Sequence, residues 1–236
     1  MRPLLPILSI AALLLAAMIG SAQSSPKAEP RTVLDGPEVR VSSYQVPAGQ
    51  SLSLQAKNGD AIVILGDPVS WSEAAEDSEG DAEPGEPLFL TQGARHLFYP
   101  SEGDRSAFAI YQVDLKHHWT TGMRTCDSAR RCVRAIKIGH RTMGQARFFF
   151  TNGEVNAVRY QLFKGGTLSQ PYSTAKAKFD VLVVALGPLS ASAEGDDVSL
   201  GTGEAHLFSK VQKLDVRTTA DTTTFLAIQL PAADTN

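Results

Sequence analysis

Residues 44–52 read Tyr-Gln-Val-Pro-Ala-Gly-Gln-Ser-Leu, and residues 160–168 read Tyr-Gln-Leu-Phe-Lys-Gly-Gly-Thr-Leu, 116 positions later in the chain. Two further matches follow in the same order, with offsets of 110 and 117 residues. They are 93–98 with 203–208, and 106–113 with 223–230. Ordered matches at similar spacing indicate one unit that occurs twice, with insertions and deletions in its loops.

Each unit is predicted to be built of β-strands. The runs 61–65 (Ala-Ile-Val-Ile-Leu) and 181–186 (Val-Leu-Val-Val-Ala-Leu) are short, rich in β-branched residues and followed by glycine. No segment after residue 22 combines a sustained 3.6-residue apolar period with helix caps. Many short strands between Gly, Pro and Asn turns are typical of sandwiches and barrels, so we expect an all-β chain.

The N-terminus is typical of a secretory signal peptide. Residues 1–22 contain Arg2, an apolar run that is short for a membrane span, and small residues before a cleavage point after Ala22. The remaining 214 residues carry a net charge of about −4, which argues against a nucleic-acid binder. No later stretch is apolar enough to span a membrane, so we expect a periplasmic or secreted protein.

The chain has two cysteines, Cys126 and Cys132. In an exported protein the expected state is a disulfide, which would stabilise so short a loop by roughly 2 kcal/mol. The alternative is a redox or metal pair, but redox pairs usually have two intervening residues and zinc would need further ligands.

Two charged segments interrupt the repeat. The first, at 72–87, holds seven acidic residues and is predicted to be a solvated insertion; calcium binding is the alternative, although the spacing matches no EF-hand loop. The second is the basic connector at 117–131, which carries the cysteine pair, with Cys126 inside it and Cys132 directly after it, and continues into a basic first strand of the second unit. It is either a solvated link or a site for an acidic partner. The predicted organisation is therefore a first domain at 32–116 and a second at 132–232.

The repeated unit resembles a cupin, and the whole chain resembles a bicupin. The second half of the cupin signature is Gly, five residues, Pro, one residue, Gly, two residues, His, three residues, Asn. Both copies contain its glycines and its histidine, but neither has its proline or its asparagine. The matching positions are Gly85, Thr91, Gly93, His96 and Pro100 in the first unit, and Gly195, Gly201, Gly203, His206 and Lys210 in the second. The resemblance implies two tandem jelly-roll barrels, also called double-stranded β-helices.

The first half of the signature supplies most of the metal ligands, as His-x-His followed by Glu. Here Gln55 and Lys57 follow Gly49, and Tyr172 and Thr174 follow Gly166, at the places of the two histidines. At the place of the glutamate, only the looser matches Asp60 and Asp180 occur. A stable transition-metal site normally needs three or four protein ligands, so we expect no tight metal in either barrel.

The candidate site residues are those that the cupin frame would direct into the barrel mouths, where such barrels hold ligands. They are His96, His206, Gln55, Lys57, Tyr172, Thr174 and Asp180. Each histidine could instead serve only to satisfy buried neighbours. No catalytic residue is assigned, because the sequence has no nucleophile elbow, no His-Glu-x-x-His motif and no phosphate loop.

Three functions remain open. The favoured one is an exported, non-catalytic cupin that binds an unidentified small molecule or has a structural role. The alternative is a metal-dependent cupin enzyme of the dioxygenase or isomerase type, holding Fe, Mn or Zn through a non-standard ligand set. The third is an interaction protein that uses the acidic and basic segments. Edge strands of such barrels also make a homo-oligomer a candidate assembly.

Overall fold

The computed structural model describes residues 28–73, 78–101, 106–116, 124–126, 132–152, 155–172 and 179–232. Within these ranges the regular elements are all strands, β1 to β20, and their pairings are antiparallel. The all-β prediction is confirmed. The expected signal peptide lies outside the described residues, and the described part contains no helix of the length and apolarity that a membrane crossing requires.

The first barrel consists of two sheets. Sheet A has the strand order β1-β2-β9-β4-β7, and sheet B has the order β3-β8-β5-β6. Their strands are β1 (Arg31–Asp35), β2 (Val39–Val46), β3 (Leu52–Gln55), β4 (Ala61–Leu65), β5 (Val69–Glu73), β6 (Ser78–Ala82), β7 (Pro87–Leu90), β8 (Arg95–Pro100) and β9 (Phe108–Leu115).

The second barrel repeats this plan. Sheet C has the order β10-β12-β13-β20-β15-β18, with β11 also paired to β12, and sheet D has the order β14-β19-β16-β17. Their strands are β10 (Arg124–Thr125), β11 (Val133–Ile138), β12 (Arg141–Thr151), β13 (Asn156–Phe163), β14 (Thr167–Pro171), β15 (Phe179–Ala185), β16 (Leu189–Ala193), β17 (Asp196–Leu200), β18 (Ala205–Val211), β19 (Lys213–Arg217) and β20 (Thr222–Pro231).

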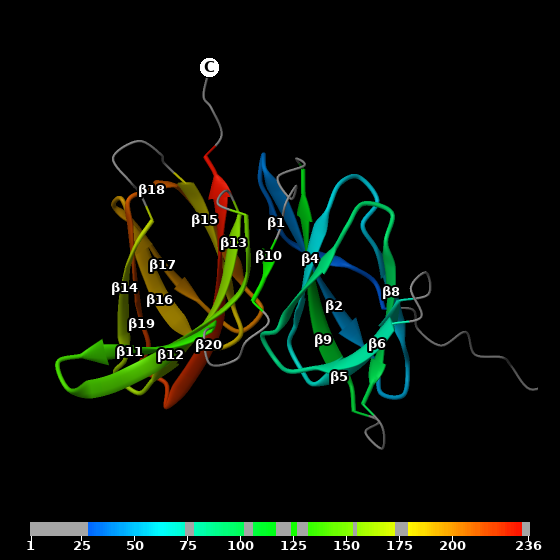
Figure 1. The fold of residues 1–236 in the computed structure, drawn as a ribbon, viewed down its shortest axis with the longest axis horizontal. Helices are drawn as coiled ribbons and strands as arrows, with labels where there is room; N and C mark the ends of the chain where they lie inside the picture. Colours follow the sequence, from blue (N-terminus) through cyan, green and yellow to red (C-terminus); the bar gives the residue numbers. More distant parts are fainter. Residues whose placement is uncertain are drawn as a thin grey trace, which may run out of the picture.

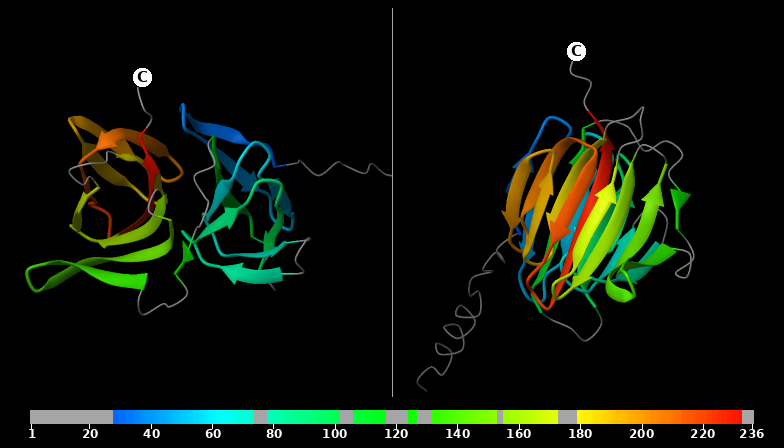
Figure 2. Two further views of the ribbon diagram at one scale, coloured as in Figure 1. Left: turned by 45° about the horizontal axis from the view of Figure 1, so that its top comes forward. Right: turned by 90° about the vertical axis from the view of Figure 1, so that its left-hand side faces the viewer.

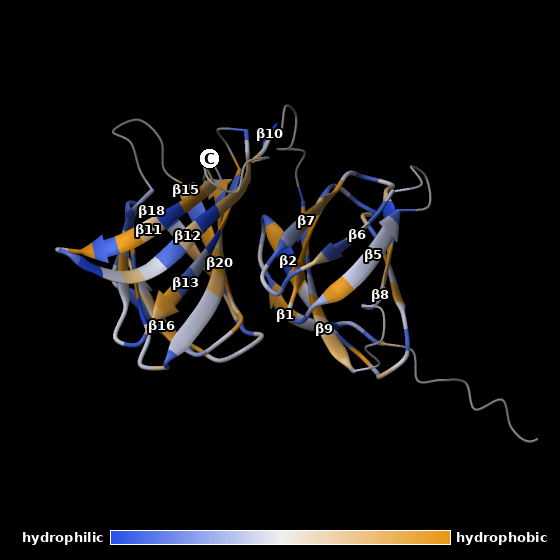
Figure 3. Ribbon diagram, turned by 60° about the horizontal axis from the view of Figure 1, so that its bottom comes forward, coloured by the Kyte–Doolittle hydropathy of each residue, from blue (hydrophilic) through white to orange (hydrophobic). Residues whose placement is uncertain are grey.

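The two barrels stand side by side, as Figure 1 shows, and their sheets form four layers in the order B, A, C, D. One apolar cluster fills each barrel, and a third lies between sheets A and C, where it joins residues such as Val113 of β9 to Ile228 of β20. The strands that meet in the middle of the molecule carry many of the hydrophobic residues (Figure 3).

This layering explains the two apolar runs of the sequence. Strands β4 and β15 lie in the two middle layers, so each is covered on one face by its own barrel core and on the other by the opposite sheet. All five residues of β4 are buried. A strand covered on both faces needs no polar alternation, which is why its sequence is a continuous apolar run.

The barrels contact each other through a pair of glycines at corresponding places. Gly85 and Gly203 precede β7 and β18, and both have positive φ angles, of 75° and 83°. A Cβ on Gly85 would lie 2.8 Å from Arg159 of the second barrel, and one on Gly203 would lie 2.8 Å from Tyr111 of the first. Both positions therefore need glycine for conformation and for close approach.

Strand pairing corrects two of the three sequence matches. We call positions equivalent when they occupy the same place in the pairing of both barrels. Tyr44 and Tyr160 are equivalent, as the sequence predicted, but they pair with Ile110 and Phe225, so Phe225 is not the equivalent of Phe108. The match of 93–98 with 203–208 is wrong, because these residues lie on β8 and β18, which occupy different places in their barrels.

The acidic segment is not simply a solvated insertion. Its residues 78–82 form β6, which pairs with β5. The loop after β6 contacts the second barrel: Arg159 donates a hydrogen bond of 2.8 Å to the carbonyl of Pro84, and Arg147 lies 3.8 Å from Glu86. The acidic segment thus contacts arginines of β12 and β13 within the same chain.

The disulfide prediction is confirmed. Cys126 and Cys132 are bonded, with their Cα atoms 5.9 Å apart. The bond joins the end of β10 to the start of β11, and both strands pair with β12. The β11–β12 hairpin projects from the second barrel, as the left view of Figure 2 shows.

Candidate functional site

His96 is the predicted site residue that lies deepest in the first barrel. It belongs to β8 and is 5% exposed, and its Nε2 lies 3.1 Å from Oε2 of Glu73 on the adjacent strand β5. The ring meets Trp71 edge-on, with centroids 5.1 Å apart. Its Nδ1 has no hydrogen-bond partner among the described residues. An imidazole whose second nitrogen is buried and unsatisfied carries a desolvation cost of about 1–3 kcal/mol.

The residues beside His96 do not complete a metal site. On the neighbouring strand β3, the buried residues are Leu52 and Leu54, followed by Ala56. Gln55 instead hydrogen-bonds Arg95 and the carbonyl of Gly93, each at 3.4 Å. Lys57 is exposed. The prediction that Gln55 and Lys57 line the cavity is wrong, because side chains alternate along a strand and a frame shift of one residue turns them outward.

No metal ligand set replaces the missing histidines in the described part of the chain, where no three His, Cys, Asp or Glu side chains gather in a way that could hold a metal ion. His96 with Glu73 supplies two donors. The residues present therefore do not fit the metal that cupin enzymes bind, because a stable site needs three or four ligands.

In the second barrel, apolar residues occupy the same places. Leu214 pairs with Gln170 as His96 pairs with Leu54, so Leu214 is the equivalent of His96. Ala193 occupies the place of Glu73, and Ala191 that of Trp71. Leu214 is 0% exposed. The second barrel thus has no inward imidazole at this level.

His206 is not the equivalent of His96 in the second barrel. It lies on β18, opposite Val183, and its Nε2 is 2.7 Å from Oδ2 of Asp196 at the start of β17. Its ring also contacts Phe208, with centroids 4.6 Å apart. Because β17 and β18 belong to different sheets, the His206–Asp196 bond links sheets C and D at their edge.

Tyr172 does point into the second barrel, where it packs against the apolar core. Burial raises the pKa of Tyr172 well above its usual range, and the nearby Tyr160 raises it further. Tyr160 stacks on Phe225 at a centroid distance of 5.1 Å. The neighbouring candidate, Thr174, lies outside the described residues.

Asp180 has a structural partner. It is 4% exposed and accepts a hydrogen bond of 2.7 Å from the backbone N–H of Lys210. Asp60, at the matching place in the first barrel, accepts one of 2.8 Å from the N–H of Gln92. Asp60 thus anchors the turn before β8, and Asp180 anchors the end of β18 just before β19, which accounts for their presence in both units.

The first barrel contains a second buried polar group, which was not predicted from the sequence. Gln112 is buried, and its amide donates to Asp114 at 2.6 Å and to the carbonyl of Gln55 at 3.5 Å. Burial raises the pKa of Asp114, whereas the Gln112 bond and Arg40 lower it. Burial also raises the pKa of Tyr44, and so does the charge of Asp114. The sequence did contain a sign of this cluster, because Gln112 and Asp114 alternate with apolar residues along β9, as Tyr44 does along β2.

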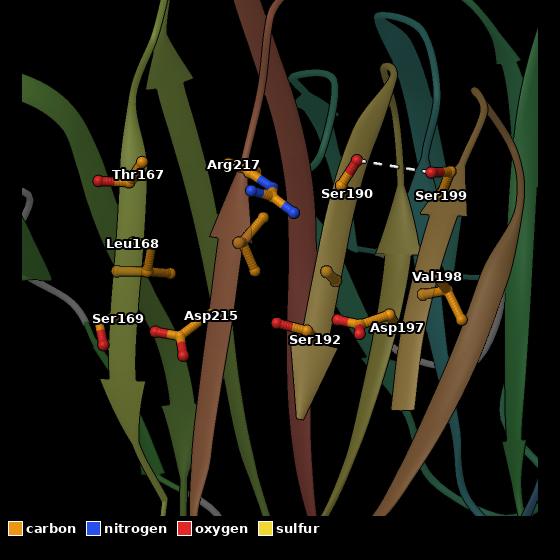
Figure 4. A pocket seen from close by; sticks show the side chains of 12 residues that line it. Thr167, Leu168, Ser169, Ser190, Ser192, Asp197, Val198, Ser199, Asp215 and Arg217 are labelled. Atoms are coloured by element: carbon orange, nitrogen blue, oxygen red, sulfur yellow. Dashed lines mark hydrogen bonds between the residues drawn. The ribbon is translucent and has the colours of Figure 1, made fainter. Parts of the chain in front are cut away.

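A polar groove lies on the outer face of sheet D. It has a volume of about 410 Å³ and is shown in Figure 4. Strand pairing arranges its outward side chains in two rows across four strands. The first row is Thr167, Arg217, Ser190 and Ser199, and the second is Ser169, Asp215, Ser192 and Asp197.

The groove is hollowed into the sheet face because the side chains at its centre are small. Ser190 and Ser199 face each other at 3.5 Å, while the alternate residues, such as Ala191, belong to the barrel core. A second hollow of about 560 Å³ shares Ser190, Ser199 and Arg217 with the first. Short side chains in the centre and longer ones beside them give the sheet a concave polar surface.

Solved structures show what this fold is. The chain is similar to a cupin 2 conserved barrel domain protein from Leptotrichia buccalis, with a TM-score of 0.51 and 13% identity over 92% of this chain and 94% of that one. It is similar to Streptomyces albus HEPD with 2-hydroxyethylphosphonate and Fe(II) bound, with a TM-score of 0.62 and 9% identity over 91% and 73%. It is also similar to procruciferin, an 11S globulin from Brassica napus, with a TM-score of 0.58 and 8% identity over 82% and 77%.

These likenesses establish a cupin fold, and the predicted resemblance is confirmed at that level. At such identities they carry no function. No family model matches the sequence. No curated protein matches it either.

Proposed function

We propose that this protein is a metal-independent cupin that binds a small polar molecule and catalyses no metal-dependent reaction. One observation carries the proposal: at the level of His96, the first barrel supplies two donors, His96 and Glu73, and the second barrel has Leu214 and Ala193 at these places. A site with two donors lacks the three or four ligands that hold iron, manganese or zinc.

The fold alone does not choose between a metal enzyme and a binding protein. Among its structural neighbours, one is described with Fe(II) bound and another as an 11S globulin. Function in such a widely used fold depends on the residues of the site, so the number of metal-binding donors decides between the two functions.

The proposal is tested by the metal content of the purified protein. The chain, isolated without chelators, is expected to contain far less than one equivalent of iron, manganese, zinc, nickel or copper. The variants His96→Ala and His206→Ala should leave that content unchanged. Metal near one equivalent per chain that is lost in either variant would instead support the alternative of a metal-dependent dioxygenase or isomerase.

We further propose that the chain is exported to the periplasm or beyond the cell. The Cys126–Cys132 disulfide supports this location, because such bonds persist in oxidising compartments. Cell fractionation with a thiol label would test it: a protein that remains in the reducing cytosol with both thiols free would contradict export.

We also propose that the barrels, at 32–116 and 132–232, arose by duplication of one unit. Their shared strand order and the corresponding Gly85 and Gly203 support this origin.

A further inference from the structure

We infer that the outer groove of sheet D is a binding site for a polyhydroxylated small molecule that carries one carboxylate or phosphate. This inference rests on the proposed binding function and names the site and the ligand class. It places the ligand on the outside of the second barrel, away from His96.

The cationic end of the groove supplies the anchor for the anion. Arg217 is exposed and stands between Thr167 and Ser190 in the first row. Within the described ranges, no carboxylate forms an ion pair with its guanidinium. An arginine flanked by hydroxyls is well suited to a carboxylate or phosphate, since its planar fork can donate two parallel hydrogen bonds.

The second row suits the hydroxyl groups of the same ligand. Asp215 and Asp197 lie on either side of Ser192 and provide acceptors (Figure 4). The pKa of Asp215 is lowered by a hydrogen bond from Ser169 and by Lys213, whose Nζ is 2.9 Å away, so this carboxylate is charged at neutral pH. A ligand with anions at both ends would be repelled here, whereas hydroxyl donors would be bound.

The groove has the size of a small-molecule site. Its volume of about 410 Å³ falls in the range of roughly 300–1,000 Å³ that such sites occupy. The face has no aromatic side chain among the groove-lining residues, so binding depends on hydrogen bonds and charge.

The first barrel provides an internal comparison. On the outer face of its sheet B, Ser70 and Ser72 occupy the places of Ser190 and Ser192, but Tyr99 stands where Arg217 stands, and Leu97 where Asp215 stands. A hollow also lies on that face, lined by Ser70, Tyr99 and Asp81 among others. Without the arginine it should not hold an anion, so we expect one anionic ligand per chain.

Isothermal titration of the full mature chain tests the site, with D-gluconate as the carboxylate probe and D-glucose 6-phosphate as the phosphate probe. D-Glucose and inorganic phosphate are the controls. We expect saturable binding of gluconate, glucose 6-phosphate or both, with a stoichiometry of one and a loss of affinity at high salt. The two anionic probes show which acid the site prefers, and the two controls should bind at least tenfold more weakly.

The variant Arg217→Gln should weaken binding of the anionic probe at least tenfold while leaving circular dichroism unchanged. The matched variant Arg95→Gln removes an exposed arginine from the outer face of sheet B and should bind as wild type does. Absence of saturable binding by both anionic probes to the folded wild type would overturn the inference, and so would equal affinity in Arg217→Gln.

Running the titrations in EDTA separates this inference from the proposed function. Stoichiometric metal at His96 would overturn the proposed function without altering the result at Arg217, whereas an unchanged affinity in Arg217→Gln would overturn the groove alone.

Discussion

The two barrels share a strand order but differ in what fills the same inward places. The first barrel has His96, Glu73 and Trp71, and the second has Leu214, Ala193 and Ala191. The difference teaches that the fold accepts either a polar or an apolar set of side chains at this level. A buried polar pair survives there if each member is partnered, and an apolar set can replace it.

On the outer faces, it is the second barrel that has the charged residues where the first has uncharged ones. Strands β5 and β16 keep serines at the same positions, but the neighbouring strand has Leu97 and Tyr99 in the first barrel (β8) and Asp215 and Arg217 in the second (β19). The first barrel thus has a polar His–Glu pair inside, and the second has Asp215 and Arg217 on its outer face at places where the first has Leu97 and Tyr99. Substitutions that exchange these features between the barrels test whether they are independent.

The largest effect is expected from Leu214→Ala. The side chain is fully buried in the second barrel, so truncation should lower the free energy of unfolding by about 2–5 kcal/mol through lost burial and a residual cavity. Denaturant unfolding measures the loss. The control Leu97→Ala removes a leucine that is 41% exposed and should change the stability by less than about 0.5 kcal/mol. A loss below about 1 kcal/mol for Leu214→Ala would show that this core is loosely packed.

In the first barrel, Glu73→Ala should cost about 1–3 kcal/mol, because it leaves His96 buried with neither nitrogen partnered. Adding His96→Leu to this variant gives two of the three places the residue of the second barrel, with Trp71 retained, and should recover most of the loss. The two single variants and the double variant form a cycle that is read by chemical denaturation. A double variant as unstable as Glu73→Ala would contradict the interchangeability of the two fillings.

The disulfide is a difference between the barrels, because it lies in the second barrel and anchors only the edge of sheet C. Replacing Cys126 and Cys132 by serine should lower the stability by about 2 kcal/mol. Hydrogen exchange should quicken in β10, β11 and β12 and remain unchanged in sheets A and B. Faster exchange throughout the first barrel would mean that the bond supports the whole molecule.

The smallest effect concerns Asp114, whose equivalent in the second barrel is the uncharged Gln229. The folded chain raises the pKa of Asp114 above its ordinary value of 3.8, chiefly by burial. The folded state therefore holds this proton more tightly than the unfolded state, and its contribution to stability falls as pH rises from about 3.8 through the raised pKa.

Asp114→Asn keeps an oxygen for the Gln112 amide and removes the charge. It should be more stable than wild type at pH 7, by less than about 1 kcal/mol, and equal to it near pH 3. Paired unfolding curves at the two pH values measure the difference. Equal stability at pH 7 would show that the surrounding charges already offset the burial of this carboxylate.

The sequence predicted the fold class well because β-branched runs and repeated turns depend on local chemistry. Residues 61–65 form β4 and residues 181–185 belong to β15, as the runs indicated, and Tyr44 matches Tyr160 in both sequence and pairing. Cys126 and Cys132 were predictable because two cysteines in a chain that is expected to be exported have one pairing.

Site residues were harder to predict because a small error in alignment changes the face or the strand. A shift of two residues, as between Phe108 and Phe225, keeps the side chain on the same face, so the apolar pattern still matches and the error leaves no trace. A shift of one residue turned Gln55 and Lys57 outward. The Gly-x-x-His match paired His206 with His96 of β8, whose equivalent strand is β19, but His206 lies on β18, since a short motif carries no information about which strand follows it.

No sequence motif predicted the groove of sheet D. Its residues come from four strands that are brought together by long-range pairing, from Thr167 on β14 to Ser199 on β17. Single hydroxyl residues on neighbouring strands are common on any solvated sheet face, so only the pairing shows that they form two rows, one containing Arg217 and the other Asp215.

The central claim is that His96 is held by Glu73 as a structural pair and is not a metal ligand. It is tested most directly by the thermal unfolding of wild type and of the Glu73→Ala/His96→Leu double variant, each with about 1 mM Mn²⁺ or Zn²⁺ and then with EDTA. Binding at one hundred times Kd would stabilise a folded protein by about 2.7 kcal/mol. We predict the same midpoint for wild type with metal and with EDTA; a rise of several degrees in wild type that is absent from the double variant would contradict the claim.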